Sequence, residues 1–239
     1  MLTRIIKVRS RERDQAEKPF WISYGDLMTA LMVLFLVAMS VALLAVTKKV
    51  TEQELRKKRH DQQIEQLLDR IQAVTARFPG VTLDRERRVI DFGERALFEK
   101  NVYRLDASQG ELLRAFIPQV LEVADTDLGR TVLKRVAVEG FASETGTYLH
   151  NLNLSLERSQ SVLCALFAPP ASGETALTSD QLTQIRDLFI VGGYSFNNAR
   201  KTAAESQRVE LRLELYAVDE ALMRAPIAPA ENFGSCELK

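Results

Sequence analysis

The chain has few of the residues that metal, redox or disulfide-rich proteins need. Its 239 residues include two cysteines and two histidines, at positions 164, 236, 60 and 150. No CxxC pair and no cysteine–histidine spacing typical of zinc ligands occurs, so we predict no metal site and no bound cofactor. No serine, histidine and acid stand at a spacing that builds a nucleophile, and we expect the chain not to be an enzyme.

A net charge is also lacking, because 32 Lys and Arg residues face 32 Asp and Glu residues. Without a long-range positive field, broad binding of nucleic acid loses its main support. The basic run at residues 56–59 is typical of a solvated helix face. We therefore expect no direct nucleic-acid partner.

Charge is absent altogether from residues 27–46, which are twenty consecutive uncharged and mostly apolar residues. As a helix they would span ~30 Å, the hydrocarbon thickness of a bilayer. A cleaved signal peptide is the competing interpretation, but its apolar core has ~7–15 residues and a small-residue cleavage site follows it. We predict a transmembrane helix over residues 20–47. Six Lys and Arg residues precede it and six follow closely, so flanking charge does not set its orientation.

Asp26 lies at the N-terminal edge of this span, next to Trp21 and Tyr24. A charged side chain in the membrane costs ~2.5–3.5 kcal/mol on insertion scales and usually marks an ion pathway. Desolvation disfavours the charged carboxylate, which makes proton uptake and release both accessible. The alternative is an Asp that sits at headgroup level or caps the helix. Helical spacing places small and hydroxylated residues on its face, which suits close helix packing: Thr29, Ala30, Val33, Val37 and Ser40.

Residues 20–32, FWISYGDLMTALM, resemble the signature of MotB-type stator subunits. The resemblance implies that Asp26 carries the transported ion, H⁺ or, as the second choice, Na⁺. It also implies a bacterial inner-membrane protein with a cytoplasmic N-terminus, residues 1–19, and a periplasmic C-terminal domain.

Residues 48–78 contain neither Gly nor Pro and predict a helical linker. Apolar residues recur in it at spacings of three and four, which predicts a stripe that packs against a partner helix in a dimer: Ile64, Leu67, Leu68, Ile71 and Val74.

Residues 79–218 alternate between short strand and helix patterns. A hairpin is expected over 81–91, and strands over 132–140, 189–191 and 208–215. Helices are expected over 108–124, from 153 or 155 to 167, and over 181–188, with Pro118 a point where the first helix kinks or breaks. These elements predict one α+β domain with a mixed sheet covered by helices. Residues 219–239 form a tail with no helix or strand signal.

Residues 138–143 and 151–158 resemble the motif of OmpA-like peptidoglycan-binding domains, and residues 208–211 resemble their last strand. In that family an Asp at the position of Ser143 and an Arg at the position of Arg158 grip the diaminopimelate of the stem peptide. A guanidinium fork suits a carboxylate, because it donates two charge-assisted hydrogen bonds. The implied peptidoglycan site comprises Ser143, Glu144, Asn151, Leu154, Ser155 and Arg158.

Two points of this site stay open. Ser143 cannot supply the negative charge that would pair with the ligand's ammonium, so either Glu144 substitutes or binding is weaker. Arg158 has a structural alternative, a salt bridge within the domain to Glu139 or Glu144.

Residues 17–24, 148–156 and 192–199 extend the resemblance to the ZorB family of the Zorya anti-phage defence system. It implies a proton-driven rotary motor in which a dimer of this chain sits inside a pentamer of a MotA-like partner, ZorA, and is anchored to peptidoglycan. The alternatives are a flagellar MotB-type stator subunit, which has a longer linker, and a passive OmpA- or Pal-like wall tether, which needs no Asp in its span.

In an oxidising periplasm, the two cysteines would be able to form a disulfide. An intrachain bridge between Cys164 and Cys236 would attach the tail to the domain and is the favoured interpretation. A bridge between two copies and a buried free Cys164 are the alternatives.

Overall fold

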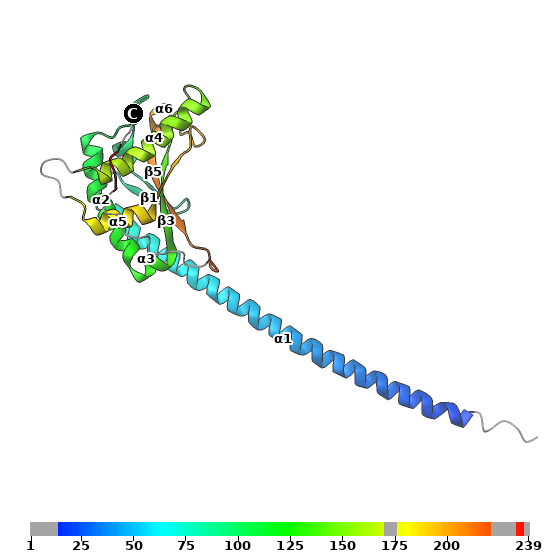
Figure 1. The fold of residues 1–239 in the computed structure, drawn as a ribbon. Coiled ribbons are helices and arrows are strands. Elements are labelled where there is room, and N and C mark those ends of the chain that lie inside the picture. Colours follow the sequence, from blue (N-terminus) through cyan, green and yellow to red (C-terminus); the bar gives the residue numbers. More distant parts are fainter. Residues whose placement is uncertain (1–13, 170–175, 221–232, 237–239) are drawn as a thin grey trace, which may run out of the picture. The chain divides into compact units, whose positions relative to one another are not determined.

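The computed structural model describes residues 14–169, 176–220 and 233–236 (Figure 1). Its contacts divide the chain into two compact units, Met1–Lys57 and Lys58–Lys239. Helix α1 (Asp14–Thr75) contributes to both units. Each unit is described by itself below.

The first unit contains the N-terminal part of α1, and residues 27–46 of this helix are uncharged on every side. An 18-residue window of Ser23–Thr75 has a mean hydropathy of 2.7, and none of it is buried by the rest of the chain. The large apolar side chains at positions 27–46 are between 46% and 71% exposed. A helix that is hydrophobic all round needs lipid or other helices around it. By length and composition, this helix is able to cross a membrane.

The last turns of α1 belong to the second unit, because their apolar stripe is buried in the domain. Leu67 and Ile71 are fully buried, Leu68 and Val74 are nearly so, and Ile64 packs against the same core. The expectation that this stripe pairs with a partner helix is therefore wrong. Burying four such side chains in their own domain leaves none of that apolar surface for a second copy.

The turn of the first hairpin holds this end of α1 through hydrogen bonds to exposed side chains of the helix. Arg85, between the first two strands, donates to Glu65 Oε2 at 2.5 Å, to Asp69 Oδ1 at 2.7 Å and to Gln72 Oε1 at 2.8 Å. These acceptors lie on one helix face at spacings of four and three residues. Each surface pair contributes little alone, but together they hold the helix against the hairpin.

The second unit contains one five-stranded mixed sheet, as the alternation of elements predicts. Its strand order is β1-β2-β5-β3-β4, with β3 and β4 parallel and the other neighbours antiparallel. The strands are β1 (Thr82–Asp84), β2 (Val89–Asp91), β3 (Leu133–Gly140), β4 (Phe189–Gly193) and β5 (Val209–Leu215). The parallel pair requires a crossover, and two helices supply it.

The α-helices that begin in this unit do so at side-chain caps. Asp106 and Thr178 each form a capping box with the Gln three residues later. Thr147 caps α4 through the N–H of His150, so this helix begins before the residue 153 or 155 expected from apolar spacing. The helical elements are η1 (Gly93–Ala96), α2 (Ala107–Asp125), α3 (Asp127–Val132), α4 (Tyr148–Phe167), α5 (Ser179–Leu188) and α6 (Ala203–Ser206), and α2 continues through Pro118.

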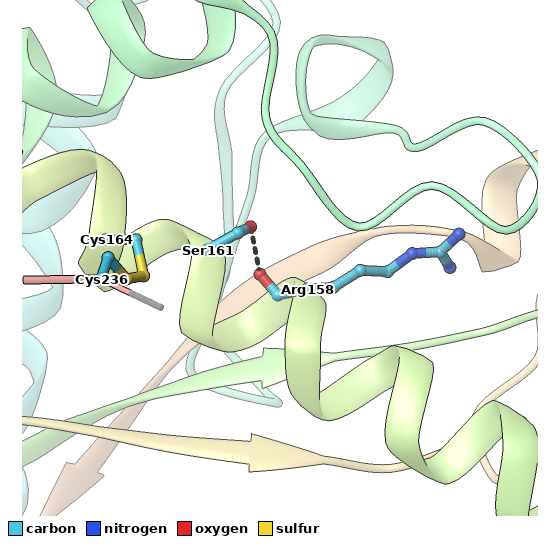
Figure 2. Close-up of a disulfide and its surroundings, with 4 residues drawn as sticks. All are labelled: Arg158, Ser161, Cys164 and Cys236. Atoms are coloured by element: carbon cyan, nitrogen blue, oxygen red, sulfur yellow. Dashed lines mark hydrogen bonds between the residues drawn. A yellow bond between two sulfur atoms is a disulfide. The ribbon is translucent and has the colours of Figure 1, made fainter. Parts of the chain in front are cut away.

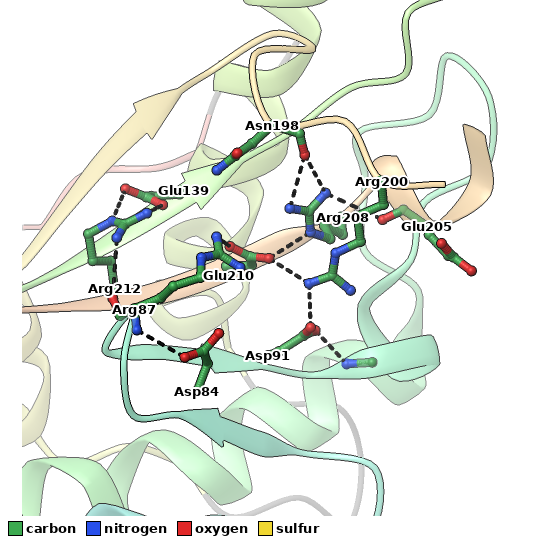
Figure 3. A network of polar contacts seen from close by, with 11 residues as sticks. Asp84, Arg87, Asp91, Glu139, Asn198, Arg200, Glu205, Arg208, Glu210 and Arg212 are labelled. Carbon is green, nitrogen blue, oxygen red and sulfur yellow. Dashed lines mark hydrogen bonds and ion pairs between the residues drawn. The ribbon is translucent and has the colours of Figure 1, made fainter. Parts of the chain in front are cut away.

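The two faces of the sheet differ in chemistry because side chains alternate along each strand. Val209, Leu211 and Leu213 of β5 belong to the apolar core of the domain. Glu210 and Arg212 point to the opposite face, where Glu210 is fully buried among arginines. Glu210 accepts from Arg208 at 2.7 Å, Arg200 at 2.7 Å and Arg87 at 3.2 Å (Figure 3).

This ion network joins the hairpin to the loop before β5. Arg200 also pairs with Asp91 of β2, and Arg212 holds Glu139 of β3 by two bonds of 2.6 and 2.9 Å (Figure 3). Glu210 thus has three arginine partners and Glu139 has two N–H donors of one arginine, and such pairing is the condition for placing ionised groups inside a protein.

Candidate functional site

The span offers one carboxylate in an otherwise uncharged surface. Asp26 is exposed on α1. Its backbone carbonyl accepts from the Thr29 hydroxyl at 2.8 Å, and the Ser40 hydroxyl donates to the Leu36 carbonyl at 2.7 Å. Both hydroxyls of this face are therefore satisfied within the helix. Within residues 23–46, Asp26 is the one Asp or Glu residue, and the rest of the described chain leaves its side chain exposed.

Two aromatic residues flank this carboxylate. Trp21 and Tyr24 are 68% and 47% exposed. Amphipathic rings of this kind gather at the membrane–water boundary, where the polar tip is wet and the ring body is not. Asp26 thus lies at the end of the apolar span and not at its centre.

In the domain, the segment that resembles OmpA-like proteins packs closely because two glycines, Gly140 and Gly193, lie where β3 and β4 meet α4. A Cβ on Gly140 would lie 1.9 Å from the Ser155 carbonyl oxygen, and one on Gly193 would lie 2.6 Å from the Leu156 nitrogen. Only glycine permits the ends of β3 and β4 to approach α4 so closely. Ser155 completes the junction, because its hydroxyl donates to Leu152 O at 2.8 Å and accepts from Ser195 N–H at 2.9 Å.

The expected wall-binding residues come together around this junction, but most of them are buried. Ser155 is fully buried, and Asn151, Leu154 and Ser143 are 2%, 6% and 7% exposed. The Asn151 amide donates to Thr145 O at 3.1 Å and so shapes the loop before α4. Glu144 is the exposed member of the set.

Arg158 is enclosed by oxygen acceptors that are not carboxylates. Its Nη1 donates to Phe141 O at 2.8 Å, its Nε to Val102 O at 2.9 Å and its Nη2 to Glu99 O at 3.0 Å and Gln207 Oε1 at 3.2 Å. The guanidinium lies 5.0 Å from the centre of the Phe98 ring. The side chain is fully buried, and desolvation lowers the pKa of Arg158 to about 10.

Neither salt bridge considered for Arg158 occurs among the described residues. Glu139 is held by Arg212, and the Arg158 acceptors are three backbone carbonyls and one amide oxygen. The contributions of Glu99 and Val102 were missed by sequence analysis. They act through backbone carbonyls, which every residue has, so no residue pattern could have identified them.

An exposed apolar patch lies beside the same loop and was also missed. Tyr148 and Leu149, in the first turn of α4, are 44% and 74% exposed. The Tyr148 ring meets the Phe196 ring edge to face, with centroids 5.6 Å apart. The adjacent Tyr148 and Leu149 were the signal available in the sequence.

Cys164 and Cys236 form a disulfide with their Cα atoms 5.6 Å apart. Phe233 packs on Phe167 of α4, with ring centroids 5.1 Å apart. Cys164 lies six residues after Arg158 on α4, and the Arg158 side chain extends away from the bridge (Figure 2). The described piece of the tail, residues 233–236, is thus attached to α4.

Comparison with known proteins assigns these features to a family. Residues 6–54 match the family model described as membrane MotB of the proton-channel complex MotA/MotB. The chain is 39% identical over 236 residues to the Zorya protein ZorB of Escherichia coli O139:H28 (strain E24377A / ETEC), covering 97% of this chain and 96% of that protein.

Among solved structures, the OmpA-like domain of FopA1 from Francisella tularensis subsp. tularensis SCHU S4 is 19% identical, with a TM-score of 0.34 over 54% of this chain and 75% of that one. A putative MotB-like protein from Desulfovibrio vulgaris is 16% identical, with a TM-score of 0.41 over 67% of this chain and 99% of that one. Because the full-length match extends through both the membrane span and the α+β domain, this chain belongs to the ZorB family of Zorya proteins.

Proposed function

We propose that the chain is the ion-carrying stator subunit of a proton-driven motor in anti-phage defence, with Asp26 as the carrier. The observation that carries the proposal is the exposed Asp26 carboxylate, the one carboxylate within residues 23–46 of the apolar helix and inside the segment that matches the MotB model. An ionisable group at such a place is expensive unless it meets water, an ion or a partner. A MotA-like ring, as the family model's description implies, would supply that partner.

Protonation of Asp26 removes its charge and so changes which groups of the ring it attracts. Each charge that crosses the membrane yields ~2.3 kcal/mol per 100 mV of potential. Two copies of Asp26, one from each chain of a dimer, cannot be in register together with a ring of five subunits. Alternate proton uptake by the two copies would then step the ring. Protons are the proposed ion and sodium is the second choice, since a carboxylate serves either.

The disulfide supports a domain outside the cytoplasm. Bridges such as Cys164–Cys236 form and persist in oxidising compartments, and the bacterial periplasm is one. With one membrane-crossing helix, a periplasmic domain requires a cytoplasmic N-terminus. The chain would then be an inner-membrane protein with its α+β domain on the periplasmic side.

The domain is proposed to hold the subunit still by binding peptidoglycan. Support comes from the resemblance of the loop and helix around Asn151 to OmpA-like wall-binding domains, and from the exposed Glu144 and Tyr148 at its rim. A carboxylate of the stem peptide is the expected ligand of Arg158, because a guanidinium fork matches it.

The first experiment replaces Asp26 with Asn in cells that carry the complete operon. Phage plating and co-purification with the MotA-like partner are measured together. We expect protection to be lost while the complex still assembles, because Asn keeps the size of Asp but takes up no proton. Asp26→Glu keeps a carboxylate and should retain part of the protection. Asp61→Asn changes an exposed acid of the same helix beyond the span and should change neither readout.

The outcomes separate the candidate functions. Full protection by Asp26→Asn would contradict ion transfer and leave a passive wall-anchored tether. Loss of both protection and assembly would show that Asp26 is needed for packing against the partner and not for ion transfer. A flagellar stator would restore motility and not phage resistance when expressed in a strain that lacks its own stator.

A further inference from the structure

Two of the donors on Arg158 are occupied by a short turn at the surface. Nε donates to Val102 O at 2.9 Å and Nη2 donates to Glu99 O at 3.0 Å. The turn, residues 99–102, is closed by the Val102 N–H, which donates to Glu99 O at 3.1 Å. It joins η1 to the segment before α2. Two of the three backbone carbonyls that accept from Arg158 thus come from one four-residue turn.

These two donors are the pair that a carboxylate would use. A carboxylate bound to the side of a guanidinium accepts from Nε–H and from the neighbouring Nη–H with its two oxygens. The carbonyls of Glu99 and Val102 present two oxygens to the same two N–H groups. The turn therefore occupies the position of the carboxylate ligand.

The remaining contacts of Arg158 do not depend on the turn. Phe141 O and Gln207 Oε1 hold Nη1 and Nη2, at 2.8 and 3.2 Å, and the Phe98 ring lies 5.0 Å from the guanidinium. Phe98 is itself fixed, because its N–H donates to Gln207 O at 2.7 Å and its side chain is buried. Removal of the turn would leave the guanidinium in place with two donors exposed.

The turn is built from exposed residues in a conformation of limited stability. Glu99, Lys100 and Asn101 are exposed and Val102 is 36% exposed, whereas Arg158 below them is fully buried. Asn101 has φ of +60°, in the left-handed region that asparagine tolerates better than other non-glycine residues do. Exposure and this φ place the turn among the easily opened parts of the domain.

We propose that residues 99–102 form a lid that blocks Arg158 by imitating a carboxylate, so that the domain must open this turn before it binds the stem peptide. The lid rests on the proposed wall binding of the domain. It regulates that site, since the ligand carboxylate and the two carbonyls compete for the same N–H groups. Binding affinity is then reduced by the fraction of molecules in which the turn is closed.

The experiment compares Asn101→Val with Asn101→Gly in the full chain in detergent. A β-branched valine is strained at positive φ, whereas glycine is not, so the first variant opens the lid and the second keeps it closed. The first readout is modification of Arg158 by phenylglyoxal, followed by mass spectrometry. The second is binding to purified peptidoglycan sacculi and to a diaminopimelate-containing stem tripeptide.

We expect Asn101→Val to raise both the modification rate and the tripeptide affinity by about tenfold, from the cost of placing a non-glycine residue in the left-handed region. Asn101→Gly should not raise either. Equal modification rates in the wild type and Asn101→Val would overturn the lid, whether or not sacculi bind. Faster modification of Asn101→Val with no binding by any variant would instead overturn the proposed wall binding, and with it the regulatory role of the lid.

Discussion

Arg158 is the residue whose surroundings differ most from those of an ordinary charged side chain. It is fully buried, desolvation lowers its pKa to about 10, and its acceptors are dipoles of uncharged groups. A pKa of about 10 still leaves it charged at neutral pH. The guanidinium connects the 99–102 turn, the residue after β3 and Gln207, two residues before β5, so it organises the loop region even without a ligand.

Replacement of Arg158 by Met should lower the free energy of unfolding by about 3 kcal/mol, because the carbonyls of Phe141 and Val102 lose the Arg158 donor and Glu99 O keeps only the Val102 N–H. Arg158→Lys keeps the charge but not the fork and should lose less. Urea denaturation of the purified chain measures both. A loss below about 1 kcal/mol for Arg158→Met would contradict the proposed role of these bonds.

At the scale of elements, α4 packs closely on β3 and β4 because glycines at the contact have no Cβ. Gly192 and Gly193 are neighbours in β4, yet their surroundings differ. A Cβ on Gly193 would meet the backbone of α4 at 2.6 and 2.9 Å, whereas one on Gly192 would meet the movable ring edge of Tyr194 at 3.1 Å. Backbone cannot yield as a side chain can, so the two positions should respond differently.

Gly193→Ala should therefore destabilise the domain by about 3 kcal/mol, and Gly192→Ala by under about 1 kcal/mol. Thermal unfolding of both variants, followed by circular dichroism, compares them directly. Similar losses in the two variants would mean that β4 and α4 move apart without penalty.

The ion network on the other face of the sheet allows a second comparison, between Glu210 and Glu214 of β5. Glu210 is fully buried with three arginines, while the Glu214 side chain is 35% exposed and pairs with Arg135 at 2.7 Å. Glu210→Gln should cost about 3–5 kcal/mol, since it leaves the buried Arg208 without its carboxylate. Glu214→Gln should cost less than about 1 kcal/mol. Urea denaturation distinguishes them, and equal midpoints would refute a structural role for the network.

At the scale of the whole molecule, the disulfide connects residues 72 positions apart. The closed loop contains α5, β4, α6 and β5, so the bridge restricts much of the unfolded domain. Loop-closure entropy for a loop of this length is worth about 4 kcal/mol. The same bond reports the compartment of the domain, because a cytoplasmic domain would keep its thiols reduced.

Cys164→Ser should therefore lower the free energy of unfolding by about 2–4 kcal/mol, and the Cys164→Ser, Cys236→Ser double variant should lose no more than the single one. In cells, maleimide-polyethylene glycol should label the wild-type chain only after reduction. Labelling of unreduced chain would place the domain in the cytoplasm and contradict the proposed topology.

Much of the domain could be predicted from local patterns. The alternation at residues 208–215 identified β5, and the apolar spacing of α4 and α5 identified their bodies. The start of α4 was missed, because Thr147 caps the helix and it begins at Tyr148, before the start at 153 or 155 that apolar spacing favoured. Of the expected wall-binding residues, the structure leaves Glu144 exposed and buries Arg158, a difference set by backbone oxygens 56 and 59 residues away in the chain.

The sequence by itself determined the membrane span and its single acid, since twenty uncharged residues and Asp26 need no folded context to be recognised. Only the tertiary structure decided that the apolar stripe from Ile64 to Val74 packs in the core of its own domain, because the same spacing suits a partner helix equally well. It likewise decided the surroundings of Arg158. Residue spacing does not predict which distant backbone carbonyls the fold brings to the Arg158 guanidinium. Those carbonyls determine whether the guanidinium is open to a ligand.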